Sequence, residues 1–98
     1  MVLRIFSVQV GPGQEAALEP IEDEVYRHYR AAKGCRSVTL FVDRVKGEWG
    51  GVSVWESEED IRWFAESGVL APLIARVKPL LTAPPVDQIY SIYEPRTG

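Results

Sequence analysis

Apolar and polar residues change their spacing several times along the chain, and each change predicts a new element. Residues 2–10 are rich in β-branched and aromatic residues, which is typical of a strand. After a Gly-Pro-Gly break, apolar residues recur every three or four positions from Leu18 to Ala32, as on one face of a helix. Pro20 lies inside this pattern, so we expect the first turn to kink away or the main helix to begin there. Gly34 is placed to end the helix in a left-handed conformation.

The middle of the chain predicts a β-hairpin that leads into a second helical region. Residues 35–45 and 49–56 alternate between two faces, with a short Lys-Gly-Glu turn between them. Ser57 has the position of a helix N-cap. The apolar stripe that follows is interrupted near Gly68, so we expect two helical pieces. Residues 86–94 follow two prolines and indicate a last strand.

The predicted order is strand-helix-strand-strand-helix-strand, which indicates an α+β, ferredoxin-like fold. Such a fold has a four-stranded antiparallel sheet with both helices on one face. No internal repeat, linker or low-complexity stretch divides the 98 residues, so we expect one domain over residues 1–98.

The alternation within the hairpin predicts which residues face the helices. We expect the aliphatic positions to point toward them: Val38, Leu40, Val42, Val52 and Val54. The other face then presents Thr39, Phe41, Ser53 and Trp55, and it is too apolar to be left in water. Two helices on one side of a sheet leave this face uncovered. We therefore expect a homodimer in which two sheets pack face to face.

Charge and composition exclude several classes of partner and site. The net charge is −3 and the 11 Lys and Arg residues are scattered, unlike the basic stripe of a nucleic-acid-binding protein. Cys35 is the single cysteine, which excludes a disulfide within the chain and a zinc site built from cysteines. The acidic runs at 22–24 and 58–60 are interpreted as solvated helix faces or helix N-termini rather than metal ligands.

The same inspection gives an expectation about location. No apolar run approaches the ~20 residues of a membrane span, and the N-terminal segment is too short and too polar for a signal peptide. We therefore expect a cytoplasmic protein that does not contact a membrane.

Two segments resemble a known family. The segment VSVWESEEDIRWF, residues 52–64, resembles the strand-Trp-x-Ser-helix junction of the antibiotic biosynthesis monooxygenases. The segment APLIARVKPLLTAPPVDQIYSIYE, residues 71–94, resembles their proline-bounded helix end and closing strand. The resemblance implies a dimeric α/β barrel. Members of this family include cofactor-free oxygenases of anthrones and quinols, haem-degrading enzymes, and proteins without an assigned reaction.

The anthrone-oxidising members use a tryptophan at the end of the third strand, and Trp55 matches it. They also use an asparagine four residues earlier and a tyrosine six residues later. Gly51 and Ile61 stand at those two positions here. The resemblance therefore carries over one of three residues.

The haem-degrading members use an asparagine in the first strand, a tryptophan on the second helix and a histidine ten residues further on. Ser7, Phe64 and Ile74 fall at or near these positions. Without an imidazole to ligate iron, haem degradation is not expected.

The functional hypothesis is a cofactor-independent monooxygenase that binds a small aromatic substrate, a quinol or a polycyclic phenol. The substrate carbanion would react with dioxygen directly, so no cofactor and no metal are expected. Trp55 would form a wall of the pocket, and His28 or a tyrosine would accept the proton. Ser7 or Ser53 would donate hydrogen bonds.

Further aromatic residues complete the predicted site, and each candidate also has a structural explanation. The predicted contacts include Phe41, Trp63 and Tyr90, and the other tyrosines that could supply a phenol are Tyr26, Tyr29 and Tyr93. The structural alternative for Trp55 is that it fills space between two sheets, and for His28 that it bonds a backbone carbonyl. The alternative for the whole chain is a non-catalytic homodimeric barrel that binds a ligand or only self-associates. An isomerase or decyclase on the same scaffold is a third reading.

Overall fold

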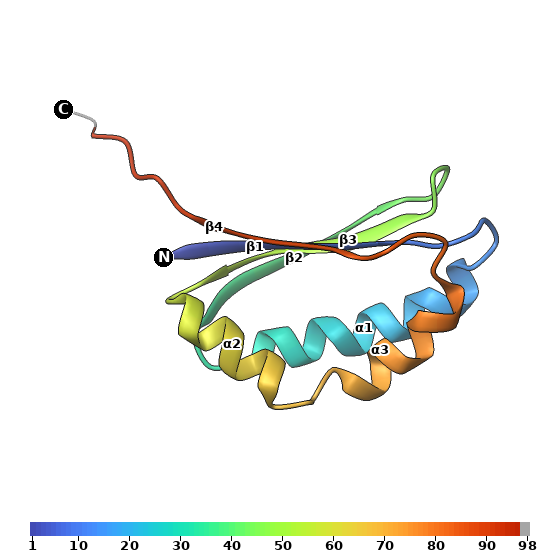
Figure 1. The fold of residues 1–98 in the computed structure, drawn as a ribbon, viewed down its shortest axis with the longest axis horizontal. Helices are drawn as coiled ribbons and strands as arrows, with labels where there is room; N and C mark the ends of the chain where they lie inside the picture. Colours follow the sequence, from blue (N-terminus) through green and yellow to red (C-terminus); the bar gives the residue numbers. More distant parts are fainter. Residues whose placement is uncertain (97–98) are drawn as a thin grey trace.

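The structure, a computed structural model, describes residues 1–96 and places its helices in one layer beneath a single sheet (Figure 1). The sheet has the strand order β2-β3-β1-β4, and every neighbouring pair is antiparallel. The predicted α+β, ferredoxin-like fold is confirmed. The elements in chain order are β1 (Val2–Gln9), α1 (Glu15–Ala31), β2 (Cys35–Asp43), β3 (Glu48–Trp55), α2 (Glu58–Glu66), α3 (Ala71–Val77), the 3₁₀ turn η1 (Lys78–Leu80) and β4 (Val86–Ser91).

Helix α1 begins earlier than its proline suggested. It starts at Glu15 and contains Pro20, so the expectation that the main helix begins at the proline is wrong. The turn before Pro20 is held by Leu18, whose side chain is fully buried. Burying such a side chain stabilises by about 1.5–3 kcal/mol, which offsets the backbone hydrogen bond that proline cannot make. Gly34 follows the helix with φ of 85°, as predicted.

The second helical region is divided as the sequence predicts. The Ser57 hydroxyl oxygen accepts a hydrogen bond from the backbone N–H of Asp60 at 3.2 Å, so α2 has the predicted N-cap. Gly68, with φ of 76°, lies in the break between α2 and α3. Because of this break, α2 and α3 are separate helices rather than one continuous helix.

The strand register shows which side chains face the helices, and it corrects one prediction. In an antiparallel pair, residues directly opposite each other share a face. Ser53 lies opposite Val38 and opposite Arg4, on the inner face that the helices cover. Trp55 lies on that same face, and Val52 and Val54 lie on the outer one. The expectation that Val52 and Val54 face the helices while Ser53 and Trp55 face away is therefore wrong. The residues of β3 that share a face with the aliphatic residues of β2 are Ser53 and Trp55.

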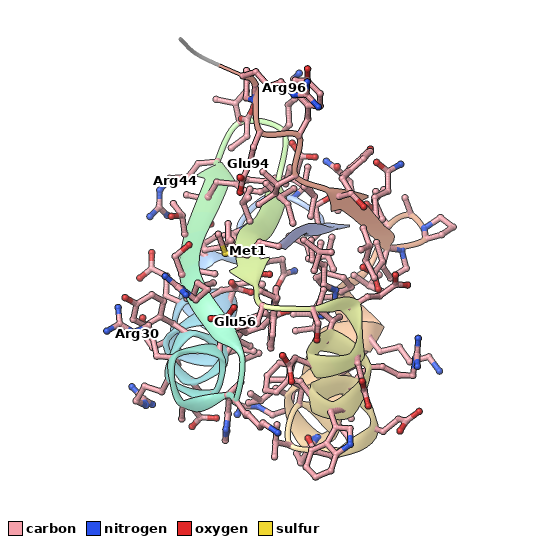
Figure 2. The ribbon with its side chains drawn as sticks, turned by 90° about the vertical axis from the view of Figure 1, so that its left-hand side faces the viewer. Met1, Arg30, Arg44, Glu56, Glu94 and Arg96 are labelled. Atoms are coloured by element: carbon pink, nitrogen blue, oxygen red, sulfur yellow. The ribbon has the colours of Figure 1, made fainter. Side chains whose placement is uncertain are left out.

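The outer face of the sheet carries no helix. Its partly buried apolar residues come from three strands: Leu3, Ile5, Phe41, Val52 and Val54. Strand β4 adds exposed Val86 and Tyr90 to this face. After β4 the chain leaves the sheet on the side opposite the helices, where Glu94 and Arg96 lie (Figure 2).

Candidate functional site

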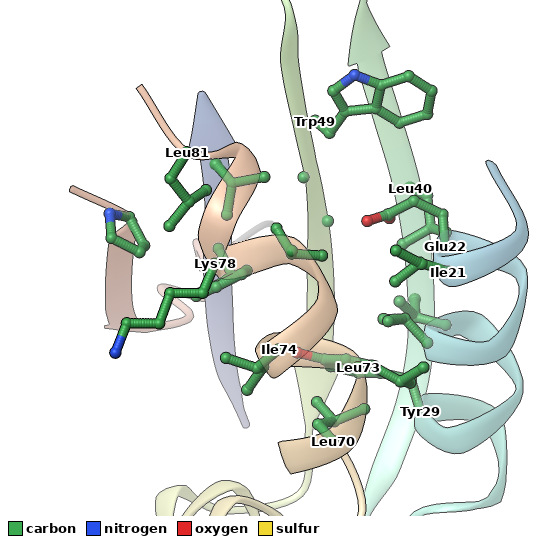
Figure 3. A pocket seen from close by; sticks show the side chains of 18 of the residues that line it. Ile21, Glu22, Tyr29, Leu40, Trp49, Leu70, Leu73, Ile74, Lys78 and Leu81 are labelled. Atoms are coloured by element: carbon green, nitrogen blue, oxygen red, sulfur yellow. The ribbon is translucent and has the colours of Figure 1, made fainter. Parts of the chain in front are cut away.

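A cavity of about 350 Å³ lies between the inner face of the sheet and helices α1 and α3 (Figure 3). Its size is at the lower end of the range for small-molecule sites, roughly 300–1,000 Å³. The floor is open because β3 has glycines there, and a glycine projects no side chain into the space. The residues that line the cavity include Arg4, Glu22, Tyr29, Leu40, Trp49 and Gly51.

Most of the cavity wall is apolar. Helix α1 contributes Ile21 and Val25, and α3 contributes Leu73 and Val77. The indole of Trp49 closes the end of the space near the hairpin turn (Figure 3). Such a wall favours a ligand with a large apolar surface, and its few polar groups fix the ligand's orientation.

Arg4 supplies the positive charge of the site. Its guanidinium bonds the Asp87 carboxylate through two contacts of 2.9 Å, from Nε and from Nη2. Its third nitrogen, Nη1, donates to the Tyr29 hydroxyl at 3.0 Å. The Arg4 side chain is 11% exposed. A paired, planar guanidinium of this kind holds its direction well.

The environment keeps both members of the Arg4–Tyr29 pair protonated. Burial lowers the pKa of Arg4, but its hydrogen bond to Asp87 and the nearby Tyr29 and Asp87 groups outweigh that effect and leave it raised. Burial is also the largest cause of the raised pKa of Tyr29, and Arg4 partly opposes it. Tyr29 therefore enters the cavity as a neutral phenol. Because its oxygen accepts from Arg4, its own O–H can donate to a ligand.

Glu22 is a carboxyl group in this apolar space. Its side chain extends from α1 into the cavity beside Leu40 (Figure 3). Burial, with a smaller contribution from the neighbouring Asp23 carboxylate, raises the pKa of Glu22 to about 7. Within residues 1–96 we find no hydrogen bond or ion pair made by this carboxyl group. The interpretation of residues 22–24 as a solvated face is therefore wrong for Glu22.

The predicted site residues of β3 lie in the core beside the cavity. Trp55 is 0% exposed, and its indole N–H donates to the Ser53 hydroxyl at 2.8 Å. Its ring meets the Tyr29 ring edge-on, with centroids 5.9 Å apart, and lies 5.4 Å from Phe64. Neither Trp55 nor Ser53 lines the cavity. Trp55 reaches the site through Tyr29, whose ring it holds in place.

The remaining predicted site residues are dispersed. Ser7, Phe41 and Tyr90 lie on the outer face of the sheet, with Ser7 buried and Tyr90 exposed. His28 is exposed on α1, and Trp63 is 66% exposed on α2. None of these five lines the cavity. The structure thus brings Ser53 and Trp55 close to Tyr29, and keeps the others away from this space.

Sequence reasoning missed Arg4 and Glu22, although both leave a signal. Arg4 has the same alternation phase as Phe6 and Val8, so it is a charge on the inner face of its strand. Glu22 precedes Tyr29 by seven residues, which places both on one helix face. A charged residue in phase with an apolar stripe is the pattern that would have identified them.

Two kinds of feature are absent from the residues that the structure describes. Residues 1–96 contain no group of three or more His, Cys, Asp or Glu side chains arranged to hold a metal ion. Among the helices that the structure describes, none is long and apolar enough to cross a membrane.

Solved structures share this fold over nearly the whole chain. The Rv0793 protein of Mycobacterium tuberculosis is 24% identical, with a TM-score of 0.83 and 98% of both chains covered. A variant of SnoaB, a cofactor-independent oxygenase from Streptomyces nogalater, is 16% identical, with a TM-score of 0.80 over 96% of this chain and 94% of its own. An antibiotic biosynthesis monooxygenase is 15% identical, with a TM-score of 0.86 over 96% of this chain and 100% of its own.

Sequence comparison places the chain in a family. A comparison with curated proteins finds no match. The family model for antibiotic biosynthesis monooxygenase matches residues 1–71, from β1 through α2. This segment contains Arg4, Glu22, Tyr29 and the glycine floor of the cavity. The chain belongs to the antibiotic biosynthesis monooxygenase family.

Proposed function

We propose that this protein binds a small aromatic phenol or quinol in the cavity between α1, α3 and the sheet, and promotes its oxygenation without a bound cofactor. The observation that carries the proposal is the cavity itself: an apolar space of about 350 Å³ with a phenol donor and a carboxyl group on one helix. Such a space accepts a flat aromatic ring system and removes it from water. The family and the similarity to SnoaB support the reaction class.

The substrate itself supplies the electrons in this chemistry. Loss of a proton from an acidic C–H or O–H leaves an electron pair on the ring system, and dioxygen accepts electrons from it. For an anthrone, the methylene carbon gains oxygen and becomes a carbonyl, and one molecule of water leaves. One substrate and one O₂ thus give one quinone and one H₂O, so the reaction needs no external reductant.

Tyr29 is the group that orients the substrate in this proposal. Its hydroxyl accepts from Arg4 and donates to the carbonyl or phenolic oxygen of the bound molecule. As negative charge grows on that oxygen, the hydrogen bond strengthens, and the nearby guanidinium adds electrostatic stabilisation. The apolar wall increases both effects because it excludes water.

A matched pair of tyrosines tests this function. Tyr26 also lies on α1 and also accepts a hydrogen bond from an arginine, Arg30 at 3.3 Å, but it is exposed and outside the cavity. Oxygen uptake is measured with a panel of anthrones and quinols for the wild type, Tyr29→Phe and Tyr26→Phe. We expect uptake above the spontaneous rate, lowered roughly 10-fold by Tyr29→Phe, the effect of one hydrogen bond, and unchanged by Tyr26→Phe.

The panel also separates this function from the non-catalytic alternative. Wild-type protein that binds members of the panel without raising oxygen uptake would show a ligand-binding barrel rather than an oxygenase. An equal loss of uptake in both tyrosine variants would remove the cavity from the explanation.

We also propose that a second copy of the chain covers the outer face of the sheet. The apolar residues of that face, including Phe41 and Val52, are only partly buried in the single chain. A face of this kind is typically buried in an assembly. Sedimentation at micromolar concentration tests the proposal, and a monomer there would contradict it.

A further inference from the structure

We propose that Glu22 is the general base that takes the proton from the bound substrate. This inference rests on the function proposed above, and it names the residue that starts the reaction. The first support is the position of Glu22, which lines the same cavity as Tyr29 (Figure 3). Both residues are on α1, and about two helix turns separate them. A substrate held by Tyr29 therefore lies within the space that Glu22 enters.

The second support is the contrast with its two acidic neighbours. Asp23 is exposed, and Glu24 forms an ion pair with Arg76 at 3.6 Å. Neither lines the cavity. Of these three consecutive acidic residues, Glu22 combines cavity access with a carboxyl group that no described protein group neutralises.

The charged and titratable groups around the cavity favour this role. From β1, Arg4 is occupied by Asp87 of β4 and by Tyr29. From η1, Lys78 lines the cavity but extends its ammonium group away from it (Figure 3). The β2 and β3 walls beside Glu22 present Leu40, Trp49 and two glycines, which carry no charge. A proton acceptor facing this wall is not held by a permanent ion pair.

The environment also sets a suitable basicity. Burial and, to a smaller extent, the Asp23 carboxylate together raise the pKa of Glu22 to about 7. Near neutral pH a substantial fraction is then ionised, and its conjugate acid is weak enough to make it a stronger base than an exposed glutamate. General bases work best when their pKa is close to the working pH.

The proton can be followed through the whole reaction with anthrone as the probe. The methylene C–H proton moves to the Glu22 carboxylate, and the electron pair remains on the ring system, with its charge on the oxygen bonded by Tyr29. Dioxygen oxidises this anion and forms a C–O bond at the same carbon. The resulting peroxide anion takes the proton back from Glu22, and the hydroperoxide loses water to give the carbonyl. Glu22 ends the cycle as a carboxylate.

Deuterium exchange tests the first step without oxygenation. The protein is mixed with anthrone in anaerobic D₂O, and exchange of the methylene protons is followed by mass spectrometry. We expect the wild type to accelerate exchange and Glu22→Gln to lose that acceleration about 100-fold or more, the range for a general base. Glu24→Gln, which removes the same charge from the same helix outside the cavity, should exchange at the wild-type rate.

A second variant provides a readout that simple loss of structure would not give. Asp23 contributes to the raised pKa of Glu22, so Asp23→Asn should move the acid limb of the exchange rate to lower pH while the plateau rate is retained. Circular dichroism shows that each variant is folded, and quenching of tryptophan fluorescence, with Trp49 in the cavity wall, shows that anthrone is bound.

The outcomes separate this inference from the proposed function. Glu22→Gln that binds anthrone and exchanges it at the wild-type rate would overturn the role of Glu22, even if oxygen uptake persists. Wild-type protein that binds anthrone without accelerating exchange would overturn it as well. Exchange that depends on Glu22 without any oxygen uptake would support the base and overturn the oxygenase.

Discussion

The layer between the sheet and its helices has two regions, yet the one under α1 and α2 is filled and the one under α1 and α3 is hollow. The aromatic end is packed by Tyr29, Val38, Trp55, Ile61 and Phe64, all buried. The hollow middle beside it is the cavity of about 350 Å³. Tyr29 belongs to both, because its ring packs against the aromatic end and its hydroxyl faces Arg4.

The difference arises on one strand. The inner-face positions of β3 are Trp49, Gly51, Ser53 and Trp55, so two bulky indoles bracket a glycine and a serine. The packed end gives stability, and the missing side chain gives space. The cavity lies where β3 has a glycine in place of a side chain, and Trp55, the tryptophan expected in the site, packs beside the cavity.

The largest expected effect separates Trp55 on β3 from Trp63 on α2. Trp55→Ala should lower the free energy of unfolding by about 3–5 kcal/mol, because it empties the aromatic end. Trp63→Ala, at a position 66% exposed, should change it by less than about 0.5 kcal/mol. Urea unfolding measures both. Similar losses for the two variants would contradict the division into a packed end and a surface.

Gly50 and Gly51 of β3 allow the outer and inner faces of the strand to be compared directly. A Cβ at Gly50 would overlap the Phe6 carbonyl oxygen and lie 2.6 Å from the Phe41 ring on the outer face. A Cβ at Gly51 would meet the end of the Leu40 side chain at 3.1 Å, in the cavity floor. We expect Gly50→Ala to lower the free energy of unfolding by about 1–3 kcal/mol.

Gly51→Ala serves as the matched variant of this experiment. Its stability should change by less than about 1 kcal/mol, because a side-chain end can move where a backbone oxygen cannot. Anthrone affinity, measured by fluorescence quenching, should fall for Gly51→Ala as the floor rises. A greater loss of stability for Gly51→Ala than for Gly50→Ala would contradict the assignment of the open space to the inner face of β3.

The smallest expected effect is the pH-dependent change in stability caused by the Glu22 carboxyl group in the cavity. The pKa of Glu22 rises from 4.5 to about 7 on folding, so the native state holds a proton that the unfolded chain has released between these values. Stability contributed by this group is therefore lost as pH rises from about 4.5 to 7, and the loss is constant above that. Glu22→Gln should stabilise the protein by roughly 1–2 kcal/mol at pH 8 and by little at pH 4.

Urea unfolding at both pH values checks this difference, with Glu24→Gln as the control that removes an equal charge outside the cavity. If Glu22→Gln changed stability equally at pH 4 and pH 8, the carboxyl group would not be desolvated by the cavity.

The sequence predicts the fold well because its signals are local. Ser57 caps a helix and Gly68 breaks one through their own backbone preferences, and neither depends on distant contacts. The two faces of β3 are harder to predict, since Val52 and Val54 are more apolar than Ser53 and yet face outward. Face assignment there follows from the pairing register with β2, which a period of two alone does not determine.

The candidate site depends on contacts between residues far apart in the chain. Arg4 meets Tyr29 and Asp87, separations of 25 and 83 residues, and no local pattern shows that these groups meet. The raised pKa of Glu22 is caused by burial and by the neighbouring Asp23 carboxylate. The spacing of Glu22 from Tyr29 indicates its helix face, but the depth of its burial depends on packing against other elements, which the sequence does not give. The family resemblance identified Trp55, which lies beside the cavity. A resemblance matches positions along the chain, and it does not show which side chains surround each position in this protein.

The ion pair between Arg4 and Asp87 joins the segment that matches the family model to a strand beyond that match. Arg4 belongs to the segment that matches the family, residues 1–71, whereas Asp87 lies on β4, beyond that match. The acceptor that aims the guanidinium is thus supplied by the exposed edge strand of the sheet. Because Asp87 is outside the cavity lining, a substitution there is expected to change the direction of the Arg4 guanidinium while every residue of the cavity wall stays the same.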